Sequence, residues 1–154
     1  MNVRIGTVED IQIITRLHTQ LNEMMAQLQP TDYQSISEDE SWIRKNFQNT
    51  QLTYLLVEDE GEVRGLILVE SVETTRTTSA ISQQYACINQ IIIGQQYRGY
   101  GYGHALLESV KEWAQKRQLA YIQLNVLTNN VAALMFYEKE GFQDLQKIMR
   151  LSIN

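Results

Sequence analysis

The chain has 154 residues and a formal net charge of −5 at pH 7 without a basic cluster, so nucleic acid is not expected as its main partner. At this length one domain, residues 1–154, buries roughly 68–70 % of the surface of its unfolded chain. Cys87 is the only cysteine, which excludes an intramolecular disulfide and a cysteine-rich metal site, and no metal is expected. The N-terminus lacks the apolar core of a signal peptide, and no apolar run approaches the roughly 20 residues of a membrane span, so the expected location is cytoplasmic.

A strand and two helices are expected in the first 50 residues. Asn2–Ile5 has the pattern of a short strand, and apolar residues at helical spacing then predict a helix over about Glu9–Gln27. His18 lies on or beside the apolar stripe of that helix and is expected to be a packed histidine bonded to a carbonyl, not a catalytic group. Ser37, with Glu40 three residues later, predicts the start of a second helix through a capping box.

The middle of the chain has the two-residue period of strands. Leu52–Glu58 and Glu62–Glu70 flank Asp59-Glu60-Gly61, which is a hairpin turn signal. A polar loop, Glu73–Thr78, follows and receives no functional role. Ser82–Ile93 then predicts a long strand that ends in three β-branched residues.

A glycine-rich turn follows this strand and leads directly into an amphipathic helix. Glycine occupies positions 99, 101 and 103, and apolar residues at helical spacing continue to about Lys116. The amides in the first turn of a helix lack intrahelical partners, and the positive end of the helix dipole lies there. Glycines let an anion approach these amides, and Arg98 adds a positive charge. The turn therefore predicts a binding site for a phosphate or pyrophosphate.

The spacing of the glycines distinguishes between phosphate ligands. The phosphate loop of ATPases requires a lysine that is missing here, and the dinucleotide fingerprint requires an acidic residue on the next strand, Ala120–Val126, which contains none. The segment instead has the form Arg98-x-x-Gly101-x-Gly103, which resembles the acyl-coenzyme A loop of the GNAT superfamily of N-acyltransferases.

A second motif follows the next strand. The residues Asn130, Ala133 and Tyr137 fall at helical spacing on one face and offer an amide, a small gap and a phenol. Gly141 is placed to end this helix in a left-handed cap, and Phe142 is expected to begin the last strand. The segment resembles the other signature of the same family, Asn-x-x-Ala-x-x-x-Tyr-Glu-x-x-Gly-Phe.

The resemblance implies an α/β fold of the GNAT type. Its elements follow in the order β-α-α-β-β-β-α-β-α-β, and they form a central mixed, mostly antiparallel, twisted sheet with helices on both faces.

The resemblance also implies transfer of an acetyl group from acetyl-CoA, as acyl-donor cosubstrate, to a primary amine by direct attack in a ternary complex. The expected partners are a small-molecule or protein amine and, as one option, a second copy in a homodimer, with neither nucleic acid nor a membrane. The implied cofactor contacts are Ile91, Ile92, Ile93, Arg98, Gly99, Tyr100, Gly101, Tyr102, Gly103, His104, Asn130, Ala133 and Tyr137. His104, in the first turn of its helix, is placed to contact a phosphate or to face water.

Two proton transfers must accompany this reaction. Tyr137, with a reference pKa of about 10, is suited to protonate the departing thiolate as general acid. Many relatives carry a glutamate as base four residues before the last apolar position of the strand, where this chain has Asn89. The preferred candidate for the base is a water relay through Asn89 and backbone carbonyls, and Glu70 is the preferred single carboxylate. Glu73 and Glu23 are the other candidates.

An acyl-cysteine intermediate on Cys87 is not expected, because no histidine close in sequence could activate its thiol. The missing glutamate keeps a second function class open. In that reading the chain is a catalytically silent acyl-CoA-binding sensor or scaffold, whereas the tyrosine at position 137 favours an enzyme.

Overall fold

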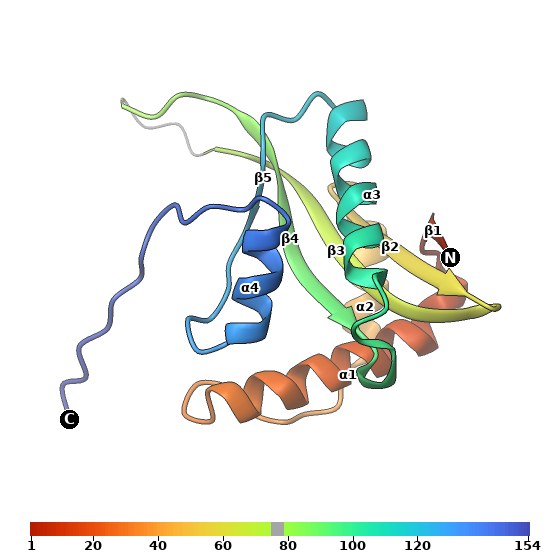
Figure 1. Ribbon diagram of the computed structural model, residues 1–154, viewed down its shortest axis with the longest axis horizontal. Helices are drawn as coiled ribbons and strands as arrows, with labels where there is room; N and C mark the ends of the chain where they lie inside the picture. Colours follow the sequence, from red (N-terminus) through yellow and green to blue (C-terminus); the bar gives the residue numbers. More distant parts are fainter. Residues whose placement is uncertain (75–78) are drawn as a thin grey trace.

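The computed structural model describes residues 1–74 and 79–154, and it is built around one five-stranded sheet (Figure 1). The strands lie in the order β1-β2-β3-β4-β5; β1 to β4 pair in antiparallel fashion, and β5 pairs with β4 in parallel. This confirms the mixed, mostly antiparallel sheet. The elements are β1 (Asn2–Ile5), η1 (Val8–Asp10), α1 (Ile11–Leu28), α2 (Glu40–Gln48), β2 (Leu52–Asp59), β3 (Glu62–Glu73), β4 (Gln84–Ile93), η2 (Gln95–Tyr97), α3 (Tyr102–Lys116), β5 (Ile122–Leu124) and α4 (Val131–Lys139).

Helices cover both faces of the sheet, as the sequence predicts. Alternate side chains of β2 and β3 point to opposite faces, so Leu56 and Leu66 pack with α1 and α2, whereas Val57 and Ile67 pack with α3 and α4. The result is two apolar cores separated by the sheet. In the described part of the chain, no helix has the length and apolar character that crossing a membrane would require.

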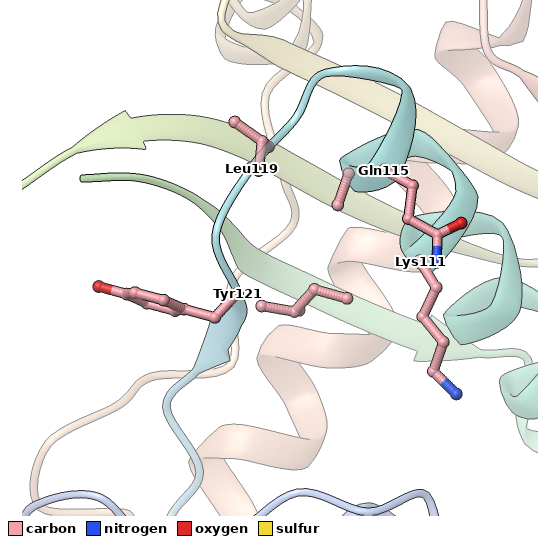
Figure 2. A pocket seen from close by; sticks show the side chains of 6 residues that line it. Lys111, Gln115, Leu119 and Tyr121 are labelled. Carbon is pink, nitrogen blue, oxygen red and sulfur yellow. The ribbon is translucent and has the colours of Figure 1, made fainter.

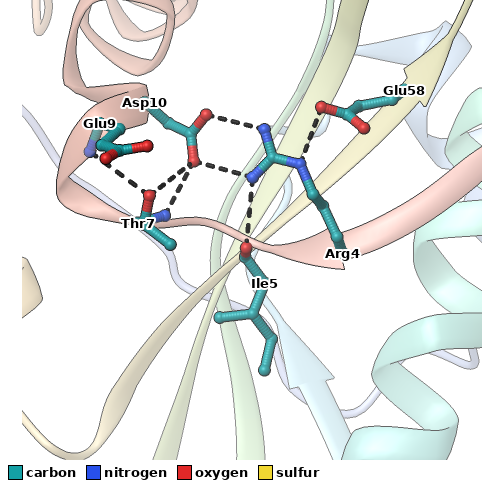
Figure 3. Close-up of polar contacts among 6 residues, drawn as sticks. All are labelled: Arg4, Ile5, Thr7, Glu9, Asp10 and Glu58. Atoms are coloured by element: carbon teal, nitrogen blue, oxygen red, sulfur yellow. Dashed lines mark hydrogen bonds and ion pairs between the residues drawn. The ribbon is translucent and has the colours of Figure 1, made fainter. Parts of the chain in front are cut away.

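Arg4 joins the first strand to the start of α1 (Figure 3). Its two terminal nitrogens each lie 2.8 Å from a carboxylate oxygen of Asp10, and its Nε lies 2.7 Å from Glu58 Oε1. The carboxylate of Asp10 also accepts the backbone N–H of Thr7 at 2.8 Å, which completes a capping box with Thr7. The hydrogen bond from Arg4 holds the pKa of Asp10 below its usual value. These contacts fix the start of α1 relative to strands β1 and β2.

Several predicted boundaries were wrong for physical reasons. The second helix begins at Glu40, not at Ser37, because the Asp39 carboxylate accepts the N–H of Ser41 at 2.9 Å and caps it. Strand β5 is limited to three residues, because only these pair with β4, whereas Ala120–Val126 was expected. Of the polar loop Glu73–Thr78, residue 73 ends β3, and residues 75–78 lie outside the described residues.

The predicted last strand was also wrong within the described residues. The N–H of Phe142 bonds to the carbonyl of Tyr137 at 3.0 Å, and Gly141 adopts a φ of 96°, so α4 ends in the expected left-handed cap. Residues 143–154 then continue without a helix or strand and extend away from the body of the molecule (Figure 1). Among the described residues, no other strand pairs with this segment.

Candidate functional site

The strands β4 and β5 separate halfway along the sheet. They pair only from Ala86 to Ile88, and Asn89 is the extra residue of a β-bulge, because the register against β3 shifts between Leu68 and Val69. Beyond the bulge, β4 pairs with β3 alone among the described residues. A gap therefore opens beside the second half of β4.

The backbone of this half-strand faces the gap. The N–H of Gly94 bonds to the carbonyl of Arg64 at 2.9 Å, and residues of antiparallel strands alternate between the two edges. Ile91 and Ile93 consequently direct their backbone groups away from β3, whereas those of Ile92 face it. The carbonyl of Ile93 already accepts a long bond of 3.4 Å from Arg98 Nε. The structure thus places Arg98 at the end of the open edge.

The glycine turn leads into α3 with two residues in the left-handed region. Gly99 has a φ of 86° and Gly101 a φ of 87°, which side chains rarely adopt. Within residues 1–74 and 79–154, no side chain caps α3, whereas Asp39 caps α2 and Asn130 caps α4. The first amides of α3 are therefore open to an anion, and Arg98 stands beside them.

Gly103 serves a purpose that the sequence did not reveal. A Cβ at this position would lie 3.0 Å from the ring of Phe136, on α4. The glycine therefore lets α4 pack closely against the first turn of α3. The same tight contact brings the two predicted motifs together, although they are about 30 residues apart in the sequence.

The two tyrosines of the loop point in different directions. Tyr100 is exposed, whereas Tyr102 is buried and its hydroxyl donates to Asp59 Oδ2 at 2.8 Å. This hydrogen bond to a carboxylate raises the pKa of Tyr102. The side chain of Tyr102 thus holds the loop to the β2–β3 hairpin, so it is bonded to the protein and only its backbone remains for a cofactor.

His104 joins α3 to the end of α4. Its Nδ1 lies 2.9 Å from Glu140 Oε1. The sequence analysis expected His104 to contact a phosphate or to face water, and it did not anticipate this partner in the protein. Ligand atoms of His104, Glu108 and Glu140 lie within 4.8 Å of one another, which is a spacing that a cation could bridge. Glu108 is however already paired with Lys111, and the His104–Glu140 contact accounts for the cluster as a link between helices, so we assign no ion to it.

Tyr137 lies on α4 and is buried in the core beneath the gap. Its ring centroid is 5.4 Å from that of Phe136 and 5.7 Å from that of Phe142. Burial raises the pKa of Tyr137 to about 12, so the phenol keeps its proton at every ordinary pH. Among the described residues, none lies within hydrogen-bonding distance of its hydroxyl. The proton is therefore not committed to another protein group.

The other two residues of this motif have local roles in the structure. Asn130 is the N-cap of α4, and its side-chain oxygen accepts the N–H of Ala133 at 3.3 Å. Ala133 packs against the core on the α3 side of the sheet. Only the amide nitrogen of Asn130 remains for a ligand.

Glu70 and Asn89 lie side by side on the opposite face of the sheet. The amide nitrogen of Asn89 donates to Glu70 Oε2 at 2.9 Å, which joins the two residues predicted for the base. Glu70 follows Leu66 and Leu68 in the alternation of β3, so it faces the α1 side. Glu23, another candidate, is exposed on α1. Glu73, at the end of β3, accepts a long hydrogen bond of 3.4 Å from the Ser82 hydroxyl. The hydrogen bond with Asn89 thus favours Glu70 among the predicted carboxylates.

Cys87 lies next to this pair, opposite Glu70 in the strand register. Burial and the charge of Glu70 raise the pKa of the thiol, which disfavours the thiolate. This agrees with the expectation that Cys87 is not a nucleophile.

A buried polar network behind β4 was missed by the sequence analysis. His18, confirmed as a packed histidine, lies with Nδ1 2.9 Å from Gln90 Oε1 and Nε2 3.1 Å from the Tyr54 hydroxyl. Because the amide oxygen can only accept, Nδ1 carries the hydrogen and Nε2 accepts from Tyr54. Asn46 completes the network by donating to the same hydroxyl at 3.0 Å. Burial lowers the pKa of His18, which matches its neutral role. The network fixes Gln90, the residue after the bulge.

No sequence signal joins these residues, because His18 and Gln90 are 72 positions apart. Two surface cavities, of about 360 Å³ between α1 and β3 and about 210 Å³ between α3 and β5, contain neither Tyr137 nor Glu70. The candidate site is an open edge of the sheet, and these two cavities lie apart from Tyr137 and Glu70.

The chain is similar in sequence to known acetyltransferases. The model of the acetyltransferase (GNAT) family matches residues 19–142. A streptothricin acetyltransferase of Escherichia coli is 40% identical over 75 residues, which are 49% of this chain and 41% of that protein, so the chain spans less than half the length of this relative.

Solved structures share the fold over the whole chain. A mutant of the BH1408 protein of Bacillus halodurans superposes with a TM-score of 0.95 at 24% identity, covering 100% of both chains. The aminoglycoside N-acetyltransferase AAC(6')-Iy, solved in complex with CoA, gives a TM-score of 0.76 at 12% identity and covers 99% of each chain.

Proposed function

Because the chain belongs to the acetyltransferase (GNAT) family, we propose that it moves an acetyl group from acetyl-CoA to a primary amine. The observation that carries the proposal is the gap between β4 and β5, which ends at the uncapped first turn of α3. A strand-like pantetheine arm and an anionic pyrophosphate fit these two features in series. A solved neighbour of the same fold holds CoA.

The protein holds the cofactor mainly with its backbone. The outward groups of Ile91 and Ile93 pair with the pantetheine amides as an added strand would. The open amides around Gly101 to His104 receive the pyrophosphate, and Arg98 adds a positive charge. The thioester then lies at the bulge, with Tyr137 on one side of the sheet and Glu70 on the other.

The acceptor must lose a proton before it can attack. An alkyl amine has a pKa near 10.4, so about one molecule in a thousand is neutral at pH 7.4, and selecting it costs roughly 4 kcal/mol. Asn89 holds Oε2 of Glu70, which leaves Oε1 to take that proton directly or through a water. Glu70 thereby supplies the function of the glutamate that β4 lacks.

The transfer itself is a single substitution at the thioester. The amine nitrogen attacks the carbonyl carbon, the carbon–sulfur bond breaks, and the sulfur leaves as thiolate. Tyr137 gives its hydroxyl proton to the sulfur, and Glu70 takes the proton lost by the nitrogen. The products are the amide and free CoA.

The acceptor is proposed to be a small cationic amine. The chain carries a net charge of −5, and Glu70 lies on the face where the amine must arrive. The name of the Escherichia coli relative makes streptothricin the first compound to test.

The test is release of free thiol from acetyl-CoA with a panel of amines, together with the mass of each product. The panel contains streptothricin, an aminoglycoside, spermidine and an amino acid. An amine that gains one acetyl group and releases one thiol supports the proposal. Tight binding of acetyl-CoA without turnover on any amine would favour the catalytically silent sensor instead, and absence of both would reject the two readings.

A further inference from the structure

A surface cavity of about 360 Å³ lies apart from the candidate site. Its walls come from α1, from the start of β3 and from the residues between β4 and the glycine turn. In Figure 1, α1 passes beneath the loop that leads into α3. Neither Arg98 nor Gly101 lines the cavity, so it is separate from the turn proposed for the pyrophosphate.

The cavity has a cation without a partner. Among the described residues that line it, two are charged, and one of them, Glu62, is already bonded. Its Oε2 accepts Arg64 Nη1 at 2.8 Å and the Tyr97 hydroxyl at 3.1 Å. The other, Arg16 on α1, forms no hydrogen bond or ion pair with any described residue. An anion in the cavity can therefore pair with Arg16, whose guanidinium matches a carboxylate with two parallel N–H bonds.

Gln20 adds a hydrogen-bond acceptor one turn further along α1. Its Oε1 is buried and receives no hydrogen bond from the described residues, which is unfavourable for an amide oxygen. The torsion of the terminal amide is broad, so this oxygen can turn toward the cavity that the side chain lines. Residues at i and i+4 of a helix are neighbours, so Gln20 lies beside Arg16. A ligand with a donor next to its anionic group satisfies both side chains.

Part of the cavity wall is apolar. Ile13 and Leu17 from α1 line it together with Val63 from β3, and all three belong to the core on the α1 side of the sheet. An aliphatic group that lies on this wall leaves water, which favours binding. The cavity thus combines a cation, a free acceptor and an apolar wall.

The other cavity, of about 210 Å³, lacks this combination. It lies between α3 and the segment that leads into β5 (Figure 2). There the side chains of Lys111 and Tyr121 point away from each other, and the ammonium group of Lys111 already pairs with Glu108. We therefore assign a ligand to the cavity beside α1 alone.

We propose that the cavity between α1 and β3 binds a free α-amino acid with an aliphatic side chain. The carboxylate of this ligand pairs with Arg16, its ammonium group donates to Gln20 Oε1, and its side chain lies on the apolar wall. An α-amino acid carries both charged groups on one carbon, as two neighbouring partners on one helix require. The proposal concerns a second site and does not depend on the proposed reaction.

Calorimetric titration without acetyl-CoA tests the ligand class. L-Leucine should bind with a Kd of about 1 mM or tighter. Isoamylamine lacks the carboxylate, isocaproate lacks the ammonium group, and glycine lacks the side chain. Each of these analogues should bind at least about tenfold more weakly than leucine. Absence of leucine binding up to about 20 mM would overturn the proposal, and so would an analogue that binds as tightly as leucine.

Substitutions test where leucine binds. Arg16→Gln and Gln20→Leu should each weaken its binding by at least about tenfold. The matched control Arg44→Gln, at an exposed position of α2, should change the affinity by less than about twofold. Glu70→Gln should also leave it unchanged, because Glu70 does not line the cavity. Circular dichroism checks that the variants fold. Full affinity in Arg16→Gln, or a loss in Glu70→Gln, would place leucine elsewhere and overturn the proposal.

Discussion

Replacing Tyr137 by phenylalanine separates the chemistry from the packing of the site. The substitution keeps the ring between Phe136 and Phe142 and removes only the hydroxyl. Because burial raises the pKa of Tyr137 to about 12, only about 1% of the phenol is ionised at pH 10, so the wild type carries its proton throughout an assay from pH 6 to 10. Loss of this general acid should lower turnover by about 10²–10³, equivalent to roughly 3–4 kcal/mol in the barrier.

Stability should change little. Among the described residues the hydroxyl has no hydrogen-bond partner, and its oxygen is not one of the buried polar atoms left without a partner, so it is in reach of solvent. Its removal therefore neither breaks a bond within the protein nor frees a buried polar group, and the melting temperature should stay close to that of the wild type. Tyr54→Phe is the matched control, since it removes a buried hydroxyl that bonds both His18 and Asn46. That variant should lose roughly 2–4 kcal/mol of stability.

Steady-state kinetics with one good amine and thermal unfolding of the three proteins provide the test. Acetyl-CoA affinity should remain within a few-fold of the wild type, because the effect belongs to the transition state. Equal turnover of wild type and Tyr137→Phe across the pH range would remove Tyr137 from the mechanism. A large fall in melting temperature for Tyr137→Phe would show that the hydroxyl has a structural bond instead.

Three further substitutions address other parts of the site. Glu70→Gln should lower turnover near neutral pH by about 10² while calorimetry shows unchanged acetyl-CoA affinity, and unchanged turnover would exclude Glu70 as base. Asn130→Ala should lose about 1 kcal/mol of stability with its cap and raise the KM for acetyl-CoA more than it lowers kcat, whereas an unchanged KM would assign Asn130 to capping alone. Burial lowers the pKa of His18, so the unfolded state binds more protons below about pH 6.5, and stability should fall as the pH drops through this range. In urea titrations at pH 7.5 and pH 5, His18→Gln should lose less unfolding free energy between the two pH values than the wild type does. An equal loss in both proteins would contradict this role of His18.

The strand, turn and helix around the glycine loop were predictable because their signals are local. Gly99 and Gly101 adopt left-handed backbone, and the helix begins directly after them. Local patterns also gave the helix capped at Asn130 and the left-handed end at Gly141. In each case the physical cause lies within a few residues of its sequence signal.

Features that depend on distant parts of the chain were not predictable. Gly103 looks like a third ligand-contacting glycine, but its neighbour is the ring of Phe136 on another helix. The bond between His18 and Gln90 joins residues of α1 and β4 that no pattern relates. The strand expected after Phe142 has the right alternation, yet among the described residues no strand pairs with it.

One isosteric pair of variants tests whether acetyl-CoA binds at the glycine turn. Asparagine and aspartate both tolerate the left-handed backbone of Gly101 better than other residues do, and they differ here mainly in charge. Calorimetric titration should show that Gly101→Asp binds acetyl-CoA at least about tenfold more weakly than Gly101→Asn, because the carboxylate repels the pyrophosphate. Equal affinity of the two variants would show that the cofactor phosphates lie elsewhere.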